Sequence, residues 1–168
     1  SQSLINLRRK NIYGLLLHSG DDLLKPNGGL LFKEMTMLKS SGLVQKIGVS
    51  VYTSEQIDDV LSKYDFDIIQ LPLNLFDQRL IQSGTLKRLK QKAVEVHVRS
   101  VFLQGLLLMP LNEIPSHFDP ILPHLKRYHA SLEENDFTPL EAALGFGLCL
   151  EEVDVVLCGV VKEHQLKE

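Results

Sequence analysis

Residues 42–50 read Gly-Leu-Val-Gln-Lys-Ile-Gly-Val-Ser, and this stretch sets the pattern for the rest of the chain. Gly42 is the residue type that most often ends a helix, while Lys46–Ser50 is a short apolar run typical of a buried parallel strand. Thr53 then begins the motif Thr-Ser-Glu-Gln, a capping box that starts a new helix. The stretch therefore predicts a helix, a strand and a second helix in immediate succession.

The same alternation extends along the chain in both directions. Short apolar runs are separated by longer segments with apolar residues at helical spacing, which is the pattern of βαβ units in a parallel sheet. The predicted strands are Ile12–Leu17, Lys46–Ser50, Asp67–Leu71, Val94–Val98 and Val153–Cys158. This rhythm fits a (β/α)8 barrel or an open doubly wound sheet.

Helices are expected between these strands. From the first helix to the last, the residues expected on their inner faces are Leu31, Met35, Leu38, Ile57, Val60, Leu61, Tyr64, Leu86, Leu89, Leu122, Leu125, His129, Leu132, Ala143, Leu144 and Leu148. Asp119-Pro120 and Thr138-Pro139 each join an N-cap residue to a first-turn proline, so they are expected to open the last two helices. Gly145-Phe146-Gly147 lies inside the last helix, where close packing explains the glycines better than a phosphate loop does.

Composition excludes several classes of protein. The 168 residues suffice for one domain with a sizeable core, and a net charge of -3 argues against nucleic-acid binding. Ser1–Lys10 lacks the apolar centre of a signal peptide and resembles the last turns of a helix, and no stretch reaches the ~18 apolar residues of a membrane span. Cys149 and Cys158 have no metal-ligand spacing and are expected to be buried thiols in a reducing compartment. We therefore expect a soluble cytoplasmic protein with no metal, membrane or nucleic-acid partner.

Polar residues gather where the predicted strands end, and the carboxyl ends of parallel strands meet at one rim. These residues are His18, Ser50, Gln70, Arg99, Ser100 and Gly159. Most of them have a structural alternative: a hydrogen-bonded core histidine, a helix-starting serine or a bridging glutamine. Arg99 keeps its charge, so it is expected to pair with a carboxylate or an anionic ligand. Tyr52 fits either a proton donor or, the interpretation we favour, a hydrophobic staple against Ile57; His97 is left without a role.

Several segments, in chain order, resemble aldo-keto reductases. The matching segments are Ser3–Leu7 with Ile12–His18 for the fourth strand, Gly42–Ser50 for the fifth, Ile69-Gln70 with Leu73–Leu75 for the sixth, Val96–Leu107 for the seventh, and Thr138-Pro139, Val155–Val160 and Gln165-Leu166 for the final helix, the eighth strand and its phosphate turn. The resemblance implies an α/β fold, a partial (β/α)8 TIM barrel of about five parallel strands with flanking helices. Residues 1–168 would form a single domain, the C-terminal part of that barrel.

The resemblance also implies an activity and a set of site residues. The activity is NADP(H)-dependent reduction of an aldehyde, a ketone or a sugar-like carbonyl, with NAD as the alternative cofactor and His18 as the catalytic residue. Ser50 and Gln70 would hold the nicotinamide carboxamide, and Arg99 stands where an aromatic ring commonly stacks under the nicotinamide. The remaining implied cofactor-binding residues are Ser100, Phe102 and Gln104 along the pyrophosphate, and Gly159, Val160 and Gln165 along the adenosine end.

The chain departs from the family pattern in three places. Val51 replaces an asparagine of the carboxamide site, and Arg99 replaces the stacking aromatic. Gly159 and Val160 replace the basic residue and serine near the 2′-phosphate, although Lys162 is close in sequence.

The largest departure concerns the proton-donating tyrosine, its lysine and its aspartate, which belong to barrel strands that would precede Ser1. We therefore expect a fragment with little turnover of its own, whose open barrel edges favour self-association. The alternatives are a non-catalytic nucleotide-binding or regulatory member of the same barrel family, and another barrel enzyme that grips a phosphate with Arg99.

Overall fold

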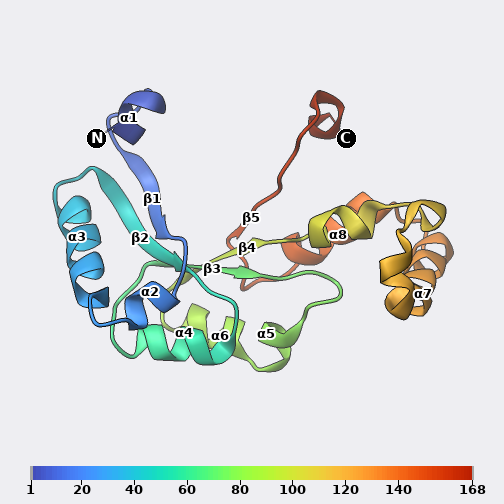
Figure 1. The fold of residues 1–168 in the computed structure, drawn as a ribbon, viewed down its shortest axis with the longest axis horizontal. Coiled ribbons are helices and arrows are strands. Elements are labelled where there is room, and N and C mark those ends of the chain that lie inside the picture. Colours follow the sequence, from blue (N-terminus) through green and yellow to red (C-terminus); the bar gives the residue numbers. More distant parts are fainter. Residues whose placement is uncertain (1, 168) are drawn as a thin grey trace.

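The computed structural model describes residues 2–167; the ends of the expected domain, Ser1 and Glu168, lie outside the described residues. At its centre is a parallel sheet with the strand order β1-β2-β3-β4-β5. The strands are β1 (Ile12–Leu17), β2 (Val44–Ser50), β3 (Ile68–Pro72), β4 (Glu95–Arg99) and β5 (Val155–Val156). The sheet curls into a half-barrel with helices on its flanks (Figure 1). The predicted partial (β/α)8 barrel of about five parallel strands is confirmed.

Helices connect the strands. The α-helices are α1 (Gln2–Asn6), α2 (Asp21–Leu24), α3 (Gly28–Ser40), α4 (Ser54–Leu61), α5 (Arg79–Gln82), α6 (Thr85–Gln91), α7 (Leu122–Glu134) and α8 (Pro139–Leu148). The 3-10 segments are η1 (Leu103–Leu108), η2 (Leu111–Glu113), η3 (Ser116–Ile121) and η4 (Glu163–Leu166). The long connection from β4 to β5 holds both α7 and α8, which accounts for the wide last interval between predicted strands.

The main core lies between the sheet and the helices that cover its outer face. Side chains alternate between the two faces of a strand, and one set packs under the helices. The strand residues of this core include Ile47, Val49, Ile69, Leu71, Val96 and Val98, and the helix residues include Met35, Ile57, Val60, Leu86 and Leu89. The alternate positions, among them Ser50, Gln70 and Arg99, therefore lie on the opposite, concave face.

The predicted strand bounds differ from the observed ones by zero to two residues at every end. β1 matches its prediction, and β2 begins at Val44 rather than Lys46. The largest error is the last strand, which was predicted over Val153–Cys158 and is regular only over Val155–Val156. Within the described sheet this strand pairs only with β4, and Asp154 N and Leu157 N donate to Val96 O and Val98 O just outside the regular pairing.

Carboxylates fix the amino ends of two strands in the same way. Asp67, just before β3, accepts from Ile47 N at 2.8 Å and pairs with Lys39 Nζ of α3 at 2.6 Å. Asp154, just before β5, accepts from Val96 N at 2.8 Å and pairs with Lys90 Nζ of α6 at 2.6 Å. Each aspartate thus ties one strand to its neighbour and to the helix that precedes that neighbour.

Two of the three predicted helix starts are observed. Thr138 forms a complete capping box with Glu141, and Thr53 caps α4 by accepting from Gln56 N at 3.2 Å. The Gln56 side chain, however, accepts from Tyr52 N rather than from the N-cap residue. The prediction for Asp119-Pro120 was wrong, because these residues lie within η3 and α7 begins at Leu122. Proline locks φ but does not decide between a 3-10 turn and an α-helix.

Several side chains expected to lie inside are exposed. Leu148 is 68% exposed at the end of α8, so the expectation that it faces inward was wrong, whereas Ala143 is fully buried. On α3, Met35 is buried but Leu31 and Leu38 are exposed. Cys149 and Cys158 are also exposed, which corrects the expectation of two buried thiols.

Gly48 and Gly147 allow close packing against the two faces of the sheet. On the concave face, a Cβ added to Gly48 would lie 2.7 Å from Ile68 O, so a larger residue there would push β2 and β3 apart. On the outer face, a Cβ added to Gly147 of α8 would lie 3.2 Å from Val156 Cγ2, which confirms close helix packing as the reason for that glycine; a Cβ added to Gly145 would meet nothing within 4 Å, so close packing does not explain Gly145. None of the described helices is both long enough and apolar enough to cross a lipid bilayer.

Candidate functional site

Three strand ends place a connected row of polar side chains on the concave face of the sheet. Ser50 ends β2, Gln70 lies in β3 and Arg99 ends β4, and the register pairs Ser50 with Gln70 directly. Ser50 Oγ donates to Gln70 Oε1 at 3.2 Å and accepts from Arg99 Nε at 3.3 Å. Ser50 is buried, whereas Gln70 and Arg99 are half-buried. The parallel topology therefore brings these three sequence-predicted residues together.

The Arg99 guanidinium is held without a counter-ion. Its Nη1 donates to Ser100 Oγ at 3.4 Å, and its Cζ lies 4.4 Å from the centre of the Tyr52 ring. The Nη2 atom is out of contact with solvent and has no hydrogen-bond partner in the described part of the chain. The expected carboxylate partner is not found among residues 2–167, in which no ion pair includes Arg99. Within the described residues, this half-buried cation at the rim is thus held by neutral groups alone.

Sequence reasoning missed Tyr52 as the partner of Arg99. Its ring is 51% exposed and lies against the guanidinium, whereas the favoured interpretation made it a staple against Ile57. The signal was available, because Tyr52 follows Ser50 by two residues, and a spacing of two puts both on one face of an extended segment.

The loop after β4 has an unusual backbone at the same rim. Ser100, Leu103 and Gln104 have φ values of 62°, 47° and 59°, in the left-handed region that favours glycine, and Gly105 follows with 90°. Asn74, buried in the loop after β3, donates from Nδ2 to Ser100 O at 3.2 Å and so ties the two loops together. Non-glycine residues in this conformation cost free energy, and such strain concentrates at functional sites.

His18 lies beside this row, at the end of β1. The register pairs Leu17 with Val49, which aligns His18 with Ser50 on the adjacent strand. The following loop is fixed to β2, because Gly20 N donates to Ser50 O at 3.0 Å. The His18 side chain is exposed, so the imidazole is accessible at the rim.

The other predicted cofactor residues divide into two groups. Ser100, Phe102 and Gln104 belong to the strained loop beside Arg99. Gly159, Val160 and Gln165 are exposed and lie after β5, on a segment that extends away from the sheet (Figure 1). Gln165 Oε1 accepts from Val161 N and Lys162 N at 2.9 and 3.0 Å, so its contacts are within its own turn. The structure therefore does not bring this second group next to Ser50.

A second polar cluster, missed by sequence reasoning, lies nearer the amino ends of the strands. The Glu95 carboxylate accepts from Tyr13 OH at 2.5 Å, pairs with Lys46 Nζ, and lies 3.3 Å from His97 Nε2. Burial raises the pKa of Glu95, but hydrogen bonds from Lys46, Tyr13 and His97 outweigh it and lower the pKa overall. Hydrogen bonds to Glu95 and Tyr13 raise the pKa of Lys46. All charges in this cluster are matched.

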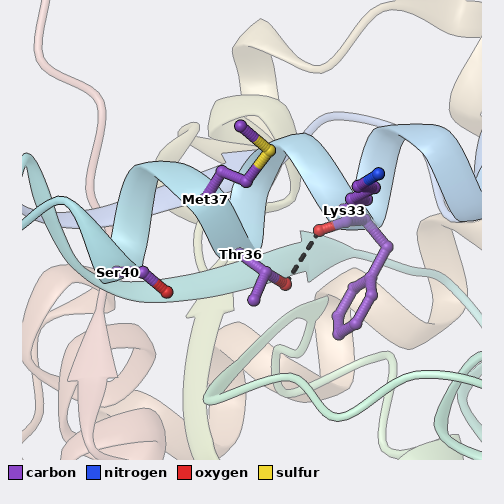
Figure 2. A pocket seen from close by; sticks show the side chains of 5 residues that line it. Lys33, Thr36, Met37 and Ser40 are labelled. Carbon is purple, nitrogen blue, oxygen red and sulfur yellow. Dashed lines mark hydrogen bonds between the residues drawn. The ribbon is translucent and has the colours of Figure 1, made fainter.

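Elsewhere on the surface, a depression runs along α3. It is lined by Phe32, Lys33, Thr36, Met37 and Ser40 (Figure 2). Thr36 Oγ1 donates to the carbonyl of Phe32 at 2.9 Å, so the hydroxyl is already used within the helix. The depression carries no group that fits the chemistry of the rim.

Solved structures of similar fold cover nearly the whole chain. An aldo-keto reductase from Bacillus halodurans in its apo form is 24% identical and has a TM-score of 0.80, with 99% of this chain and 57% of that one covered. A glycerol dehydrogenase from Gluconobacter oxydans is 24% identical with a TM-score of 0.74, with 98% and 54% covered. A putative aldo-keto reductase from Pseudomona aeruginosa is 18% identical and has a TM-score of 0.64, with 98% of this chain and 51% of that one covered. The chain thus spans just over half the length of each.

Sequence comparison gives the family directly. No curated protein matches the chain. The model of the Aldo/keto reductase family, however, matches residues 1–168. Because this match covers the whole sequence, the chain belongs to the Aldo/keto reductase family, a family of oxidoreductases.

Proposed function

We propose that the protein reduces a small aldehyde, ketone or sugar-like carbonyl with NADP(H), and that this chain supplies His18 and most of the nicotinamide site. The observation that carries the proposal is the row Gln70–Ser50–Arg99 at the carboxyl ends of three adjacent strands. NAD is the alternative cofactor, because Gly159 and Val160 offer no side-chain charge for a 2′-phosphate.

The residues at the rim fit a nicotinamide carboxamide, which has one acceptor and one N–H donor group. Gln70 supplies an amide and Ser50 a hydroxyl, and each holds the other at 3.2 Å. Preorganised polar groups of this kind fix the orientation of a ligand at little entropic cost. When bound, the cofactor would supply the hydride.

Around that cofactor, residues of this chain would polarise the substrate carbonyl group and hold the cofactor in position. His18, exposed beside Ser50, would donate a hydrogen bond to the substrate carbonyl oxygen and make its carbon more electrophilic. Ser100, Phe102 and Gln104 would lie along the pyrophosphate, and Gly159, Val160 and Gln165 along the adenosine end. The proton donor would come from outside residues 1–168, so the chain alone would turn over little substrate.

The test uses the full-length protein, with NADPH binding followed by its fluorescence and turnover followed with nitrobenzaldehyde. His18→Ala is expected to lower kcat by about 10²-fold or more while NADPH still binds. His117→Ala, which removes an exposed imidazole on η3, is the matched control and should leave kcat unchanged. Binding without turnover in the wild type would favour the non-catalytic alternative. Absence of NADPH and NADH binding would refute the proposal.

A further inference from the structure

Arg99 is the group on the concave face whose charge has no match in the described chain. The guanidinium has three contacts, all with electrically neutral groups: Ser50 Oγ, Ser100 Oγ and the Tyr52 ring. Hydroxyls and an aromatic face fix a guanidinium in place, but they do not cancel its unit charge. Among residues 2–167, the positive charge at the carboxyl end of β4 is therefore not balanced by a counter-ion.

Lys46 on the same sheet shows the contrasting arrangement. Its ammonium pairs with the Glu95 carboxylate, so the amino end of the sheet carries no excess charge from this lysine. Both cations lie on the concave face. Within the described chain, Lys46 near the amino ends of the strands has a carboxylate partner, whereas Arg99 at the carboxyl ends has none. The difference points to a role for the charge of Arg99 in what binds at the mouth.

The position of Arg99 sets which part of a ligand would feel this charge. Arg99 Nε lies 3.3 Å from Ser50 Oγ, and in the proposed function Ser50 holds the nicotinamide carboxamide. A nicotinamide ring whose carboxamide is held by Ser50 would therefore lie close to the guanidinium of Arg99. That ring is uncharged when reduced and carries a positive charge when oxidised.

We propose that Arg99 makes this site discriminate between the two redox states of the cofactor, binding the reduced, uncharged nicotinamide in preference to the oxidised, cationic one. The inference rests on the proposed function. At an effective dielectric constant of about 20 to 40, the repulsion between two unit positive charges about 7 Å apart raises the ratio of the Kd for NADP+ to the Kd for NADPH by about tenfold to fiftyfold. Arg99 thereby favours occupancy by the hydride donor and early release of the oxidised product.

Three variants of the full-length protein separate charge from shape. Arg99→Gln removes the charge but keeps hydrogen-bonding capacity toward Ser50, and Arg99→Lys keeps the charge in a different shape. Lys87→Gln, at an exposed position of α6, changes the net charge of the protein by the same amount far from the rim. For each protein, Kd is measured for NADPH by fluorescence and for NADP+ by calorimetry, with thermal unfolding as a check on folding.

The ratio of the Kd for NADP+ to the Kd for NADPH is the readout. We expect it to fall about tenfold or more in Arg99→Gln, to stay within about threefold of wild type in Arg99→Lys, and to stay unchanged in Lys87→Gln. An unchanged ratio in a folded Arg99→Gln, with both forms bound, overturns the inference and leaves the proposed function standing. If Arg99→Gln does not fold, the wild type decides, because equal affinities for the two forms contradict the proposal. Loss of all nucleotide binding in the wild type refutes the proposed function itself.

Discussion

The two ends of the sheet treat polar groups in opposite ways. At the amino ends, Asp67 and Asp154 each accept from a backbone N–H of the neighbouring strand and pair with a lysine of the helix that precedes that neighbour. At the carboxyl ends, Arg99 has no ion pair in the described chain and leaves Nη2 unpartnered. Matched groups stabilise a fold, whereas unmatched groups are available to a ligand. We therefore propose that the amino ends stabilise the fold and that the carboxyl ends bind a ligand, as expected for (β/α)8 barrels.

The backbone repeats this division. Left-handed residues near the amino ends occur singly where helices finish, as at Gly42 before β2 and Ala93 before β4. After β4, three non-glycine residues in this conformation fall within five positions, ending at Gln104. The strain is therefore concentrated at the end that we assign to binding.

The largest expected effect tests the stabilising end. Asp67→Ala removes the acceptor of Ile47 N and the partner of Lys39, so we expect the free energy of unfolding to fall by about 2–3 kcal/mol. Urea denaturation of the full-length protein measures it, and kcat/KM of the folded fraction should not change. Asp59→Ala, at an exposed position of α4, is the control for loss of a carboxylate. A decrease in the free energy of unfolding below about 0.5 kcal/mol would show that Asp67 does not stabilise the fold.

The next effect has the opposite sign and tests the binding end. Gln104→Gly relieves a left-handed conformation, so the free energy of unfolding should rise by about 1 kcal/mol while cofactor affinity drops severalfold. Asp136→Gly, at φ 57° between α7 and α8, should give a similar gain in stability with no change in affinity. Equal affinity in wild type and Gln104→Gly would place the cofactor away from this loop.

A smaller effect depends on pH and belongs to the Glu95 cluster. The folded pKa of Glu95 lies below its ordinary value of 4.5, so its stabilisation is complete above that value and disappears as pH falls through the folded pKa. We expect the stability difference between wild type and Glu95→Gln, about 1 kcal/mol at pH 6, to shrink as the pH is lowered from 5 toward 3. Chemical denaturation at each pH measures the difference. A constant difference across this range would mean that the carboxylate charge does not stabilise the cluster.

The smallest effect comes from a position that belongs to neither end. Leu148→Ala is expected to cost less than about 0.5 kcal/mol, because the side chain is 68% exposed. The helical pattern had placed Leu148 in a core, for which the cost would be about 2–5 kcal/mol. Thermal unfolding of the variant distinguishes the two, with Leu71→Ala, a fully buried position of β3, as the reference for a true core loss.

Sequence patterns predicted the sheet well because each main strand carries apolar residues on the face that packs under the helices, such as Ile47 and Val49 in β2. They also predicted that Ser50, Gln70 and Arg99 would share a rim, since parallel strands end together. Helix faces and the fifth strand were less accurate. Leu31 and Leu148 have the spacing of an inner face, but spacing does not reveal whether another element covers that face.

The contacts of the site depend on geometry that one-dimensional patterns lack. The stacking of Tyr52 on Arg99 and the contacts of Glu95 with Tyr13 and Lys46 join segments far apart in sequence, which only the folded sheet brings together. Residue types identified Arg99 as a cation in need of a partner. Only the fold shows that the described chain offers it neutral groups.

The hydrogen bond between Ser50 and Gln70 at the rim depends on Gly48, which lies deeper in the sheet. The missing side chain lets the β2 and β3 backbones meet closely one pleat below the point where Ser50 reaches Gln70. A methyl group at residue 48 would act as a wedge whose effect grows toward the mouth and opens the hydrogen bond that joins the two side chains. A substitution at Gly48 would then weaken ligand binding although the residue does not contact the ligand. A search for variants with altered affinity should therefore include positions deep on the concave face.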